Sequence, residues 1–140
     1  MTDTDVLASA ASPLARYRAH LLRGELAYQV DEDGRPVFYP RVAAPAGRRG
    51  ALSWRVSAGL GTVHATTVIA PKGEPVYNVA LIDMDEGFRL MSRVESMPPQ
   101  QVAIGLRVRM RVQMRVQAGD GDDGPVPVFD PLDANGGAAR

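Results

Sequence analysis

Four arginines at alternating positions are the residues of this chain best suited to bind a charged group. They are Arg107, Arg109, Arg111 and Arg115, all within residues 106–116. Guanidinium groups bind carboxylates and phosphates through paired hydrogen bonds. Four of them on one strand face repel one another unless acids or a bound anion neutralise them. Three interpretations follow: pairing with acids on neighbouring strands, contact with a partner subunit, or binding of a phosphate group.

Catalytic sets are not recognisable elsewhere in the sequence. The chain has no cysteine, and its serines have no histidine in a recognisable nucleophile motif. Gly59 and Gly61 are not followed by the Gly-Lys-Ser of a phosphate loop. Asp83 and Asp85 fall at a hairpin, where we expect solvation, and His64 fits a packed or surface position. We therefore predict no catalytic residue and no enzyme activity of the chain alone.

Metal ligands are also missing. His20 and His64 lie far apart and lack the spacing of a ligand pair. The acidic turn at residues 31–33 is expected to be solvated and not to hold a cation. The sequence therefore predicts no bound metal and, in the absence of cysteine, no disulfide.

The elements that position these residues are mostly short strands. Leu106, Val108, Met110, Val112, Met114 and Val116 alternate with the arginines, which is the period of a half-buried strand. Similar patterns predict an all-β, five-stranded barrel over residues 51–132. Its strands are expected at 52–69 (bent at Gly59 and Gly61), 76–83, 88–95, 106–116 and 125–129, with a turn at 119–124.

The residues before the barrel predict a helix and a hairpin. Ser12 and Pro13 form a helix start, and Gly24 a stop. Leu14, Tyr17, Leu21 and Leu22 form its apolar stripe, which either packs on the domain or docks a partner. Residues 26–40 predict a hairpin around an acidic turn, and 41–50 a loop. Residues 1–11 and 133–140 are expected to be disordered.

Composition narrows the function classes. A length of 140 residues fits one domain with a small appendage, and the formal net charge of zero offers no general attraction to nucleic acid or membrane. No apolar run is long enough to span a membrane, and no signal peptide is recognisable. We expect a cytoplasmic protein without a membrane partner.

A run of motifs in a fixed order resembles one known family. The motifs are Ser57-Ala-Gly-Leu-Gly-Thr-Val63, Tyr77-Asn-Val-Ala-Leu-Ile-Asp-Met-Asp-Glu-Gly87, Ile104-Gly-Leu-Arg-Val108 and Pro127-Val-Phe-Asp-Pro131. Their order is similar to that of the zinc-ribbon/OB-fold proteins associated with acyl-CoA enzymes, long filed as domain of unknown function thirty-five. The resemblance implies an OB topology for the barrel.

The resemblance also implies a function and exposes a departure. Members of the family commonly accompany thiolase-like or hydratase-like enzymes, and their barrel helps to line the channel for the pantetheine chain. The expected role is a non-catalytic accessory subunit in a hetero-oligomer, which contacts a coenzyme A thioester only together with its partner. The family's four cysteines would fall near Val30, Asp33 and residues 44–48, where this chain has none. The ribbon hairpin is therefore predicted to be degenerate and free of zinc.

Two sets of residues are candidates for facing a ligand or partner. They are the four arginines and the aromatic residues Tyr17, Phe38 and Tyr39. The alternative function is an OB-fold protein that binds single-stranded nucleic acid. Such proteins stack bases on aromatic platforms, which the polar faces of the predicted third and fourth strands lack, so we expect no nucleic-acid partner. An independent small-molecule enzyme is a third, less favoured hypothesis.

Overall fold

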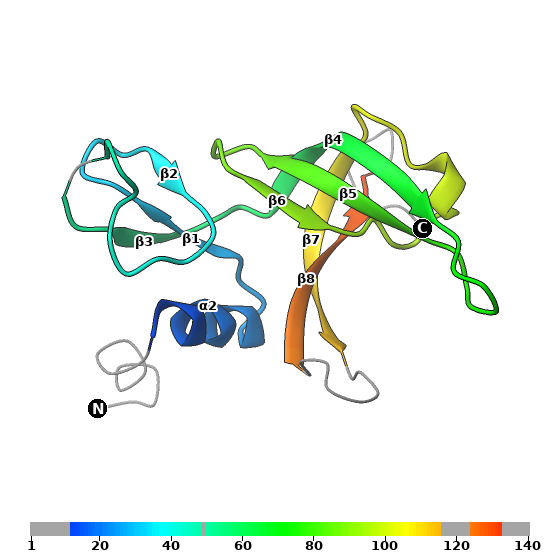
Figure 1. Ribbon diagram of the computed structural model, residues 1–140, viewed down its shortest axis with the longest axis horizontal. Helices are drawn as coiled ribbons and strands as arrows, with labels where there is room; N and C mark the ends of the chain where they lie inside the picture. Colours follow the sequence, from blue (N-terminus) through cyan, green and yellow to red (C-terminus); the bar gives the residue numbers. More distant parts are fainter. Residues whose placement is uncertain (1–11, 49, 116–123, 133–140) are drawn as a thin grey trace. The chain divides into compact units, whose positions relative to one another are not determined.

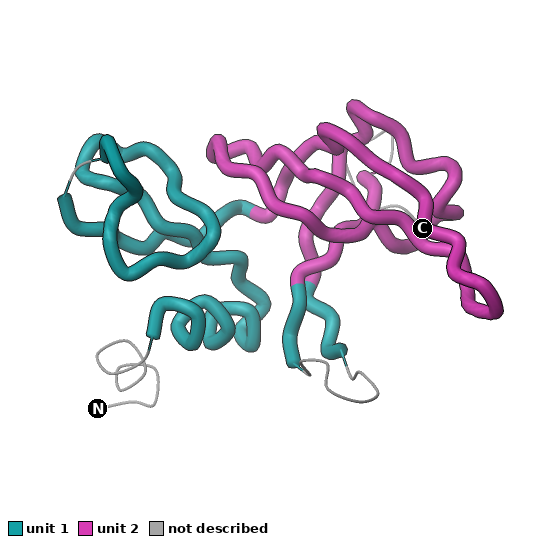
Figure 2. Tube along the Cα trace, in the orientation of Figure 1, with its two compact units in different colours: residues 1–58, 112–126 teal, residues 59–111, 127–140 magenta. Residues whose placement is uncertain are grey.

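The computed structural model describes residues 12–48, 50–115 and 124–132. The predicted disordered ends and most of the predicted turn at 119–124 lie outside these residues. The chain divides into two compact units, residues 1–58 with 112–126 and residues 59–111 with 127–140 (Figures 1 and 2). The predicted boundary lies after residue 50, whereas the first unit in the structure extends to Ala58. The first unit also includes residues 112–126 from the later part of the chain.

The first unit begins with the predicted helix, α2 (Pro13–Leu22). The Ser12 hydroxyl accepts a hydrogen bond from the Ala15 N–H at 3.1 Å, and proline occupies the first turn. Tyr17 and Leu21 are buried, whereas Leu22 is 66% exposed. Leu22 follows Leu21 directly and so points about 100° away from it. The predicted apolar stripe is therefore narrower than expected.

A three-stranded sheet accompanies this helix. Its strands are β1 (Ala27–Val30), β2 (Pro36–Val37) and β3 (Ser53–Val56), in the order β2-β1-β3. The predicted hairpin at 26–40 is present as β1 and β2. All four residues of β1 are buried, which is the expected state of a central strand.

The third strand of this sheet corrects a prediction. Residues 52–56 were expected to begin the first barrel strand, but β3 pairs antiparallel with β1, with Gln29 opposite Trp54. The chain changes sheets at Gly59, whose φ of +81° favours glycine. Gly61 is also required, because a Cβ there would lie 2.8 Å from Ile82 Cγ2 and 2.9 Å from the Asp83 carbonyl oxygen.

The other sheet has five antiparallel strands, and most of it belongs to the second unit. The strands are β4 (Leu60–Ile69), β5 (Tyr77–Met84), β6 (Arg89–Ser92), β7 (Arg107–Arg115) and β8 (Gly124–Pro131), in the order β6-β5-β4-β7-β8. A short 3-10 helix, Pro99–Gln101, lies in the connector between β6 and β7. The loop from β4 to β5 carries Lys72, the single lysine of the sequence. The predicted all-β class is confirmed.

The sheet nearly closes on itself through a parallel bridge between Val94 and Phe129. The Phe129 N–H donates to the Arg93 carbonyl at 2.9 Å, and the Glu95 N–H donates to the Phe129 carbonyl. The buried Asn78 side chain adds two bonds, donating to the Val94 carbonyl at 2.7 Å and accepting from the Val94 N–H at 2.9 Å. Val94 lies beyond the end of β6, and the Asn78 carboxamide supplies the hydrogen bonds that a neighbouring strand would otherwise give to its backbone.

The barrel core follows the predicted alternation only in part. Phe88, Leu90 and Val94 are buried as predicted, and Val108 is fully buried. Further along β7, Met110 and Val112 are half-buried and Met114 is 61% exposed. The reason is that β4 pairs with β7 only over Arg107–Arg109, so the later residues of β7 lack that neighbour. Val116 lies outside the described residues. Among the residues that the structure describes, no helix is long and apolar enough to cross a membrane.

Candidate functional site

The arginine face of β7 is partly neutralised by acids of the same barrel. Arg107 makes a two-pronged contact with Asp85, at 2.7 and 2.8 Å, and also donates to the Thr62 hydroxyl at 2.9 Å. Arg111 donates to Asp130 at 2.8 Å. For these two arginines, pairing with acids of the barrel accounts for the charge. The sequence predicted that Asp85 is only solvated at its hairpin, whereas in the structure it pairs with Arg107.

The other two arginines remain available to a ligand or partner. Arg109 is exposed and Arg115 is half-buried, and neither makes an ion pair or side-chain hydrogen bond with any residue the structure describes. An exposed guanidinium without an internal carboxylate can bind a phosphate or a carboxylate from outside. Whether any of the four arginines faces a ligand or partner stays a prediction.

A β-bulge in β4 places His64 beside Asp83 of β5. The register of β4 against β5 shifts between Val63 and Ala65, which leaves His64 as the extra residue. His64 Nδ1 lies 3.2 Å from Asp83 Oδ2, and Asp83 also accepts from Arg89. The Arg89 hydrogen bond, aided by the charges of Arg89 and His64, holds the pKa of Asp83 below its usual range. The Arg107 hydrogen bond does the same for the pKa of Asp85.

The aromatic residues predicted to face a partner form a cluster in the first unit. The ring centroids of Tyr17 and Phe38 are 5.7 Å apart, those of Tyr17 and Tyr39 5.5 Å, and all three pairs meet edge to face. Tyr17 is only 5% exposed, and its burial, followed by the nearby Tyr39, raises the pKa of its hydroxyl. Tyr17 therefore packs inside the unit, while Tyr39, at 53% exposed, keeps a face for a partner.

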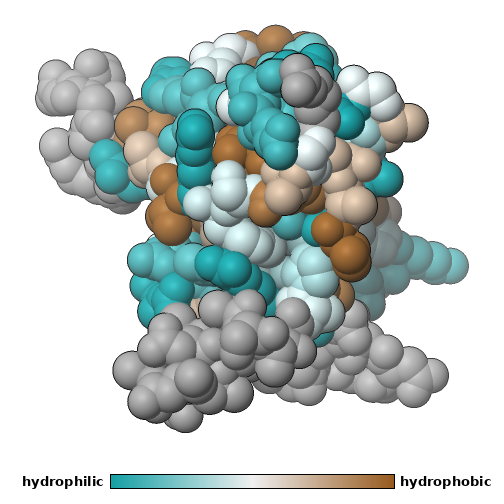
Figure 3. All heavy atoms as spheres, turned by 90° about the vertical axis from the view of Figure 1, so that its left-hand side faces the viewer, coloured by the Kyte–Doolittle hydropathy of each residue, from teal (hydrophilic) through white to brown (hydrophobic). Residues whose placement is uncertain are grey.

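The loop that carries Tyr39 is held by a buried amide. Gln29, on β1, donates to the Arg41 carbonyl at 2.8 Å and accepts from the Arg41 N–H at 2.7 Å. This pair of bonds fixes the loop between the exposed Tyr39 and Val42, which is 87% exposed. Figure 3 shows hydrophobic residues lying among hydrophilic ones on the face toward the viewer. A fixed backbone reduces the entropy that these side chains would lose on contact.

An ion pair occupies the region where the resemblance places the zinc ligands. The Asp31 carboxylate is fully buried and accepts from the N–H groups of Asp33 and Arg35, both at 2.9 Å, and from Arg48 Nε. Arg48 also donates to the carbonyls of Arg35 and Pro36. The pair thus joins the acidic turn to the loop at residues 41–50. The Arg48 hydrogen bond is the main cause that lowers the pKa of Asp31 from 3.8 to about 2.

The sequence did not reveal this pair. The acidic turn was interpreted as solvated, and that interpretation is wrong for Asp31, which is 3% exposed, although Asp33 remains exposed. The sequence did contain one signal for the burial of Asp31. An aspartate that starts a tight turn often accepts a hydrogen bond from the N–H group two residues later, which is an Asx turn. Its partner Arg48 is separated by 17 positions and carries no comparable signal.

Metal binding has no support from the described residues. None of their histidine, aspartate and glutamate side chains form a group of three or more that could hold an ion. The Asp31 carboxylate forms an ion pair with Arg48 and is therefore not available to ligate a metal ion. The absence of zinc stays a prediction, based on the missing cysteines and on this ion pair.

We expect the purified protein to contain no stoichiometric zinc, and a chelator to leave its thermal midpoint unchanged. Elemental analysis and a melting curve with and without EDTA measure both quantities. One zinc per chain, lost together with the fold on chelation, would contradict the interpretation of the ion pair as a replacement for the metal.

Comparisons with known proteins identify the barrel. Residues 54–113 match the family model described as the C-terminal OB-fold domain of ChsH2. A solved structure titled "Ltp2-ChsH2(DUF35) aldolase" aligns with a TM-score of 0.66 and 24% sequence identity, over 84% of this chain and 92% of that chain. No curated protein matches this chain. The OB fold is confirmed, and the resemblance to the zinc-ribbon/OB-fold family is confirmed for its OB domain.

Proposed function

We propose that this chain, with its barrel of the ChsH2 C-terminal OB type, is a non-catalytic subunit of an enzyme that acts on acyl-CoA thioesters. The match of residues 54–113 to that family model carries the proposal. The solved structure with the same fold is an Ltp2-ChsH2(DUF35) aldolase. The partner of this chain is proposed to be a thiolase-like or hydratase-like enzyme, in a hetero-oligomer.

The side chains of the described residues support this division of roles. The histidine–aspartate contact of the described barrel residues, His64 with Asp83, is shared with Arg89, and the His64 and Asp83 side chains are both more than 40% exposed. No serine hydroxyl is hydrogen-bonded to a histidine in the described part of the chain, so no nucleophile is activated there. The covalent chemistry is therefore assigned to the partner.

Two surfaces are proposed to contribute to the complex. In the first unit, the fixed loop presents Tyr39, Arg41 and Val42, and tyrosine and arginine are favoured at interface centres. On β7, Arg109 and Arg115 have no acid partner among the described residues and are proposed to offer their guanidinium groups to a carboxylate of the enzyme or to a phosphate of coenzyme A. The barrel contacts the thioester only when the enzyme is present.

We expect the chain alone to turn over no acyl-CoA substrate and to form a stable complex with a thiolase-like enzyme from the same genome. Co-expression followed by size-exclusion chromatography and an acyl-CoA assay measures both. Replacing Tyr39 with alanine should weaken the complex about tenfold, because a rigid aromatic anchor is lost. Val56→Ala is the control, since Val56 is also half-exposed, at 49%, in the same unit.

Tyr39→Ala tests the contact of the first unit with the enzyme better than a deletion of residues 1–40 does. Strand β1 lies between β2 and β3, so that deletion would leave β3 without its partner strand. Separate elution of the two proteins, together with full activity of the enzyme alone, would refute the accessory role.

A further inference from the structure

Strand β5, which lies between β6 and β4, carries apolar side chains on both faces at its centre. Burial alternates along β5, with Asn78, Ala80, Ile82 and Met84 facing inward. The outward positions are Tyr77, Val79, Leu81 and Asp83, all partly exposed. An antiparallel sheet that is solvated on one face normally carries polar side chains there. Val79 and Leu81 depart from that rule at the centre of the strand.

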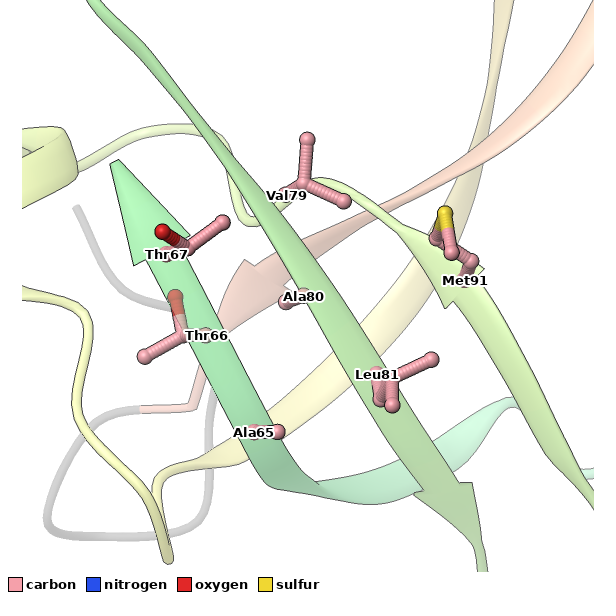
Figure 4. A pocket seen from close by; sticks show the side chains of 7 residues that line it. All are labelled: Ala65, Thr66, Thr67, Val79, Ala80, Leu81 and Met91. Carbon is pink, nitrogen blue, oxygen red and sulfur yellow. The ribbon is translucent and has the colours of Figure 1, made fainter. Parts of the chain in front are cut away.

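Their cross-strand neighbours extend the apolar surface. Ala65 on β4 and Met91 on β6 both lie opposite Leu81, and Thr67 lies opposite Val79. Together they line a shallow hollow of about 230 Å³, shown in Figure 4. We call this hollow the outer groove, defined by Ala65, Thr67, Val79, Leu81 and Met91. Met91 is 69% exposed, and methionine adapts its shape to a range of bound surfaces.

An acid at one end of the outer groove is paired, whereas an arginine at the other end has no acid partner among the described residues. At one end, Asp83 is already paired with Arg89 and His64. At the other end, the Arg93 guanidinium lies 4.1 Å from the centre of the Tyr77 ring. No carboxylate among the described residues pairs with Arg93. The stacking contact orients this cation beside the apolar surface and leaves its hydrogen-bond donors available.

The shape and charge of the groove discriminate between occupants. A free acyl chain needs a pocket that encloses most of its surface, and this hollow is small and open. A symmetric second copy would bring a second Arg93 to the same interface, with no described acid to neutralise either one. A protein segment that combines an apolar side chain with a carboxylate satisfies both the groove and Arg93.

We propose that the outer groove docks the enzyme subunit. An aliphatic or aromatic side chain of the enzyme enters the groove, and a neighbouring aspartate or glutamate pairs with Arg93. This inference rests on the proposed function, because the partner is taken to be the same enzyme. It adds an interaction site that is separate from the Tyr39 loop and from Arg109 and Arg115.

The test compares matched variants of the full chain for binding to the co-expressed thiolase-like enzyme by calorimetry. Met91→Asp should raise Kd at least about tenfold, since it places a charge in a contact that excludes water. Ile104→Asp is the control, because Ile104 is also exposed, at 71%, and lies outside the groove; it should change Kd less than about twofold. Arg93→Gln should raise Kd and reduce its dependence on salt.

Each outcome has a defined meaning. Circular dichroism on the isolated variants checks that they fold, which the exposure of Met91 favours. If the wild type binds and Met91→Asp binds equally well, the docking site is overturned and the accessory function stands. If Met91→Asp and Ile104→Asp weaken binding alike, the docking site is also overturned. If the wild type does not bind the enzyme, the proposed function fails and this inference fails with it.

Discussion

Replacing Phe129 with alanine is expected to lower the free energy of unfolding of the barrel by about 3–5 kcal/mol. The Phe129 side chain is fully buried, and its backbone forms the parallel bridge to Val94 that nearly closes the sheet. The substitution leaves a cavity at this closure, where β8 meets the segment that follows β6. Urea denaturation followed by far-ultraviolet circular dichroism measures the change.

Met91→Ala is the control for this experiment. Met91 is also a large apolar residue of the barrel, but it is 69% exposed, and its truncation should cost less than about 0.5 kcal/mol in the isolated chain. Equal losses for Phe129→Ala and Met91→Ala would show that closure at Phe129 does not stabilise the barrel.

Replacing Asp31 with asparagine is expected to destabilise the first unit strongly at neutral pH. The Asp31 oxygens are surrounded by hydrogen-bond donors from Asp33, Arg35 and Arg48. An asparagine would bring its own N–H₂ group among those donors and leave the Arg48 charge without its partner, which is costly in a buried site. The thermal midpoint should fall by several degrees, with the Trp54 fluorescence as the probe of this unit.

The pH dependence gives this prediction a second readout. The pKa of Asp31 is lowered from 3.8 to about 2 in the folded chain. Its stabilising contribution is therefore complete above the unfolded pKa and is lost as pH falls from about 4 to about 2. The difference in midpoint between the wild type and Asp31→Asn should be constant from pH 7 to pH 5 and shrink below pH 4. Asp33→Asn is the control, because its side chain is 45% exposed. A pH-independent difference would contradict the role of the Asp31 carboxylate.

Local patterns predicted the elements that depend on neighbouring residues alone. The Ser12-Pro13 start and Gly24 stop located α2, because capping is decided within a few residues. Alternation located β5, β6 and β7 and identified the buried faces of β6 and of the first part of β7. These patterns are determined by the period of the strand itself.

Features that depend on pairing between distant segments were not predictable from one sequence. The apolar, β-like pattern of residues 52–56 fits either sheet, and only the observed register assigns β3 to β1. The same holds for the bulge at His64, for Arg48 as the partner of Asp31, and for Met91 beside Leu81. Among the predicted site residues, the sequence could not distinguish Arg107 and Arg111, which pair with acids, from Arg109 and Arg115, which have no acid partner in the described part of the chain.

The single lysine in the loop between β4 and β5 has a practical consequence for mapping contacts of this protein. Amine-reactive cross-linkers modify lysine, so within this sequence they report mainly on Lys72 and miss contacts made by the arginine-rich β7. A negative lysine cross-linking result would therefore say little about a complex. The same rarity makes Lys72 a selective attachment point for a fluorophore, a few residues from the last pair of the two strands, Ile69 and Tyr77. A dye there would sense events at the Tyr77 end of the sheet without any engineered residue.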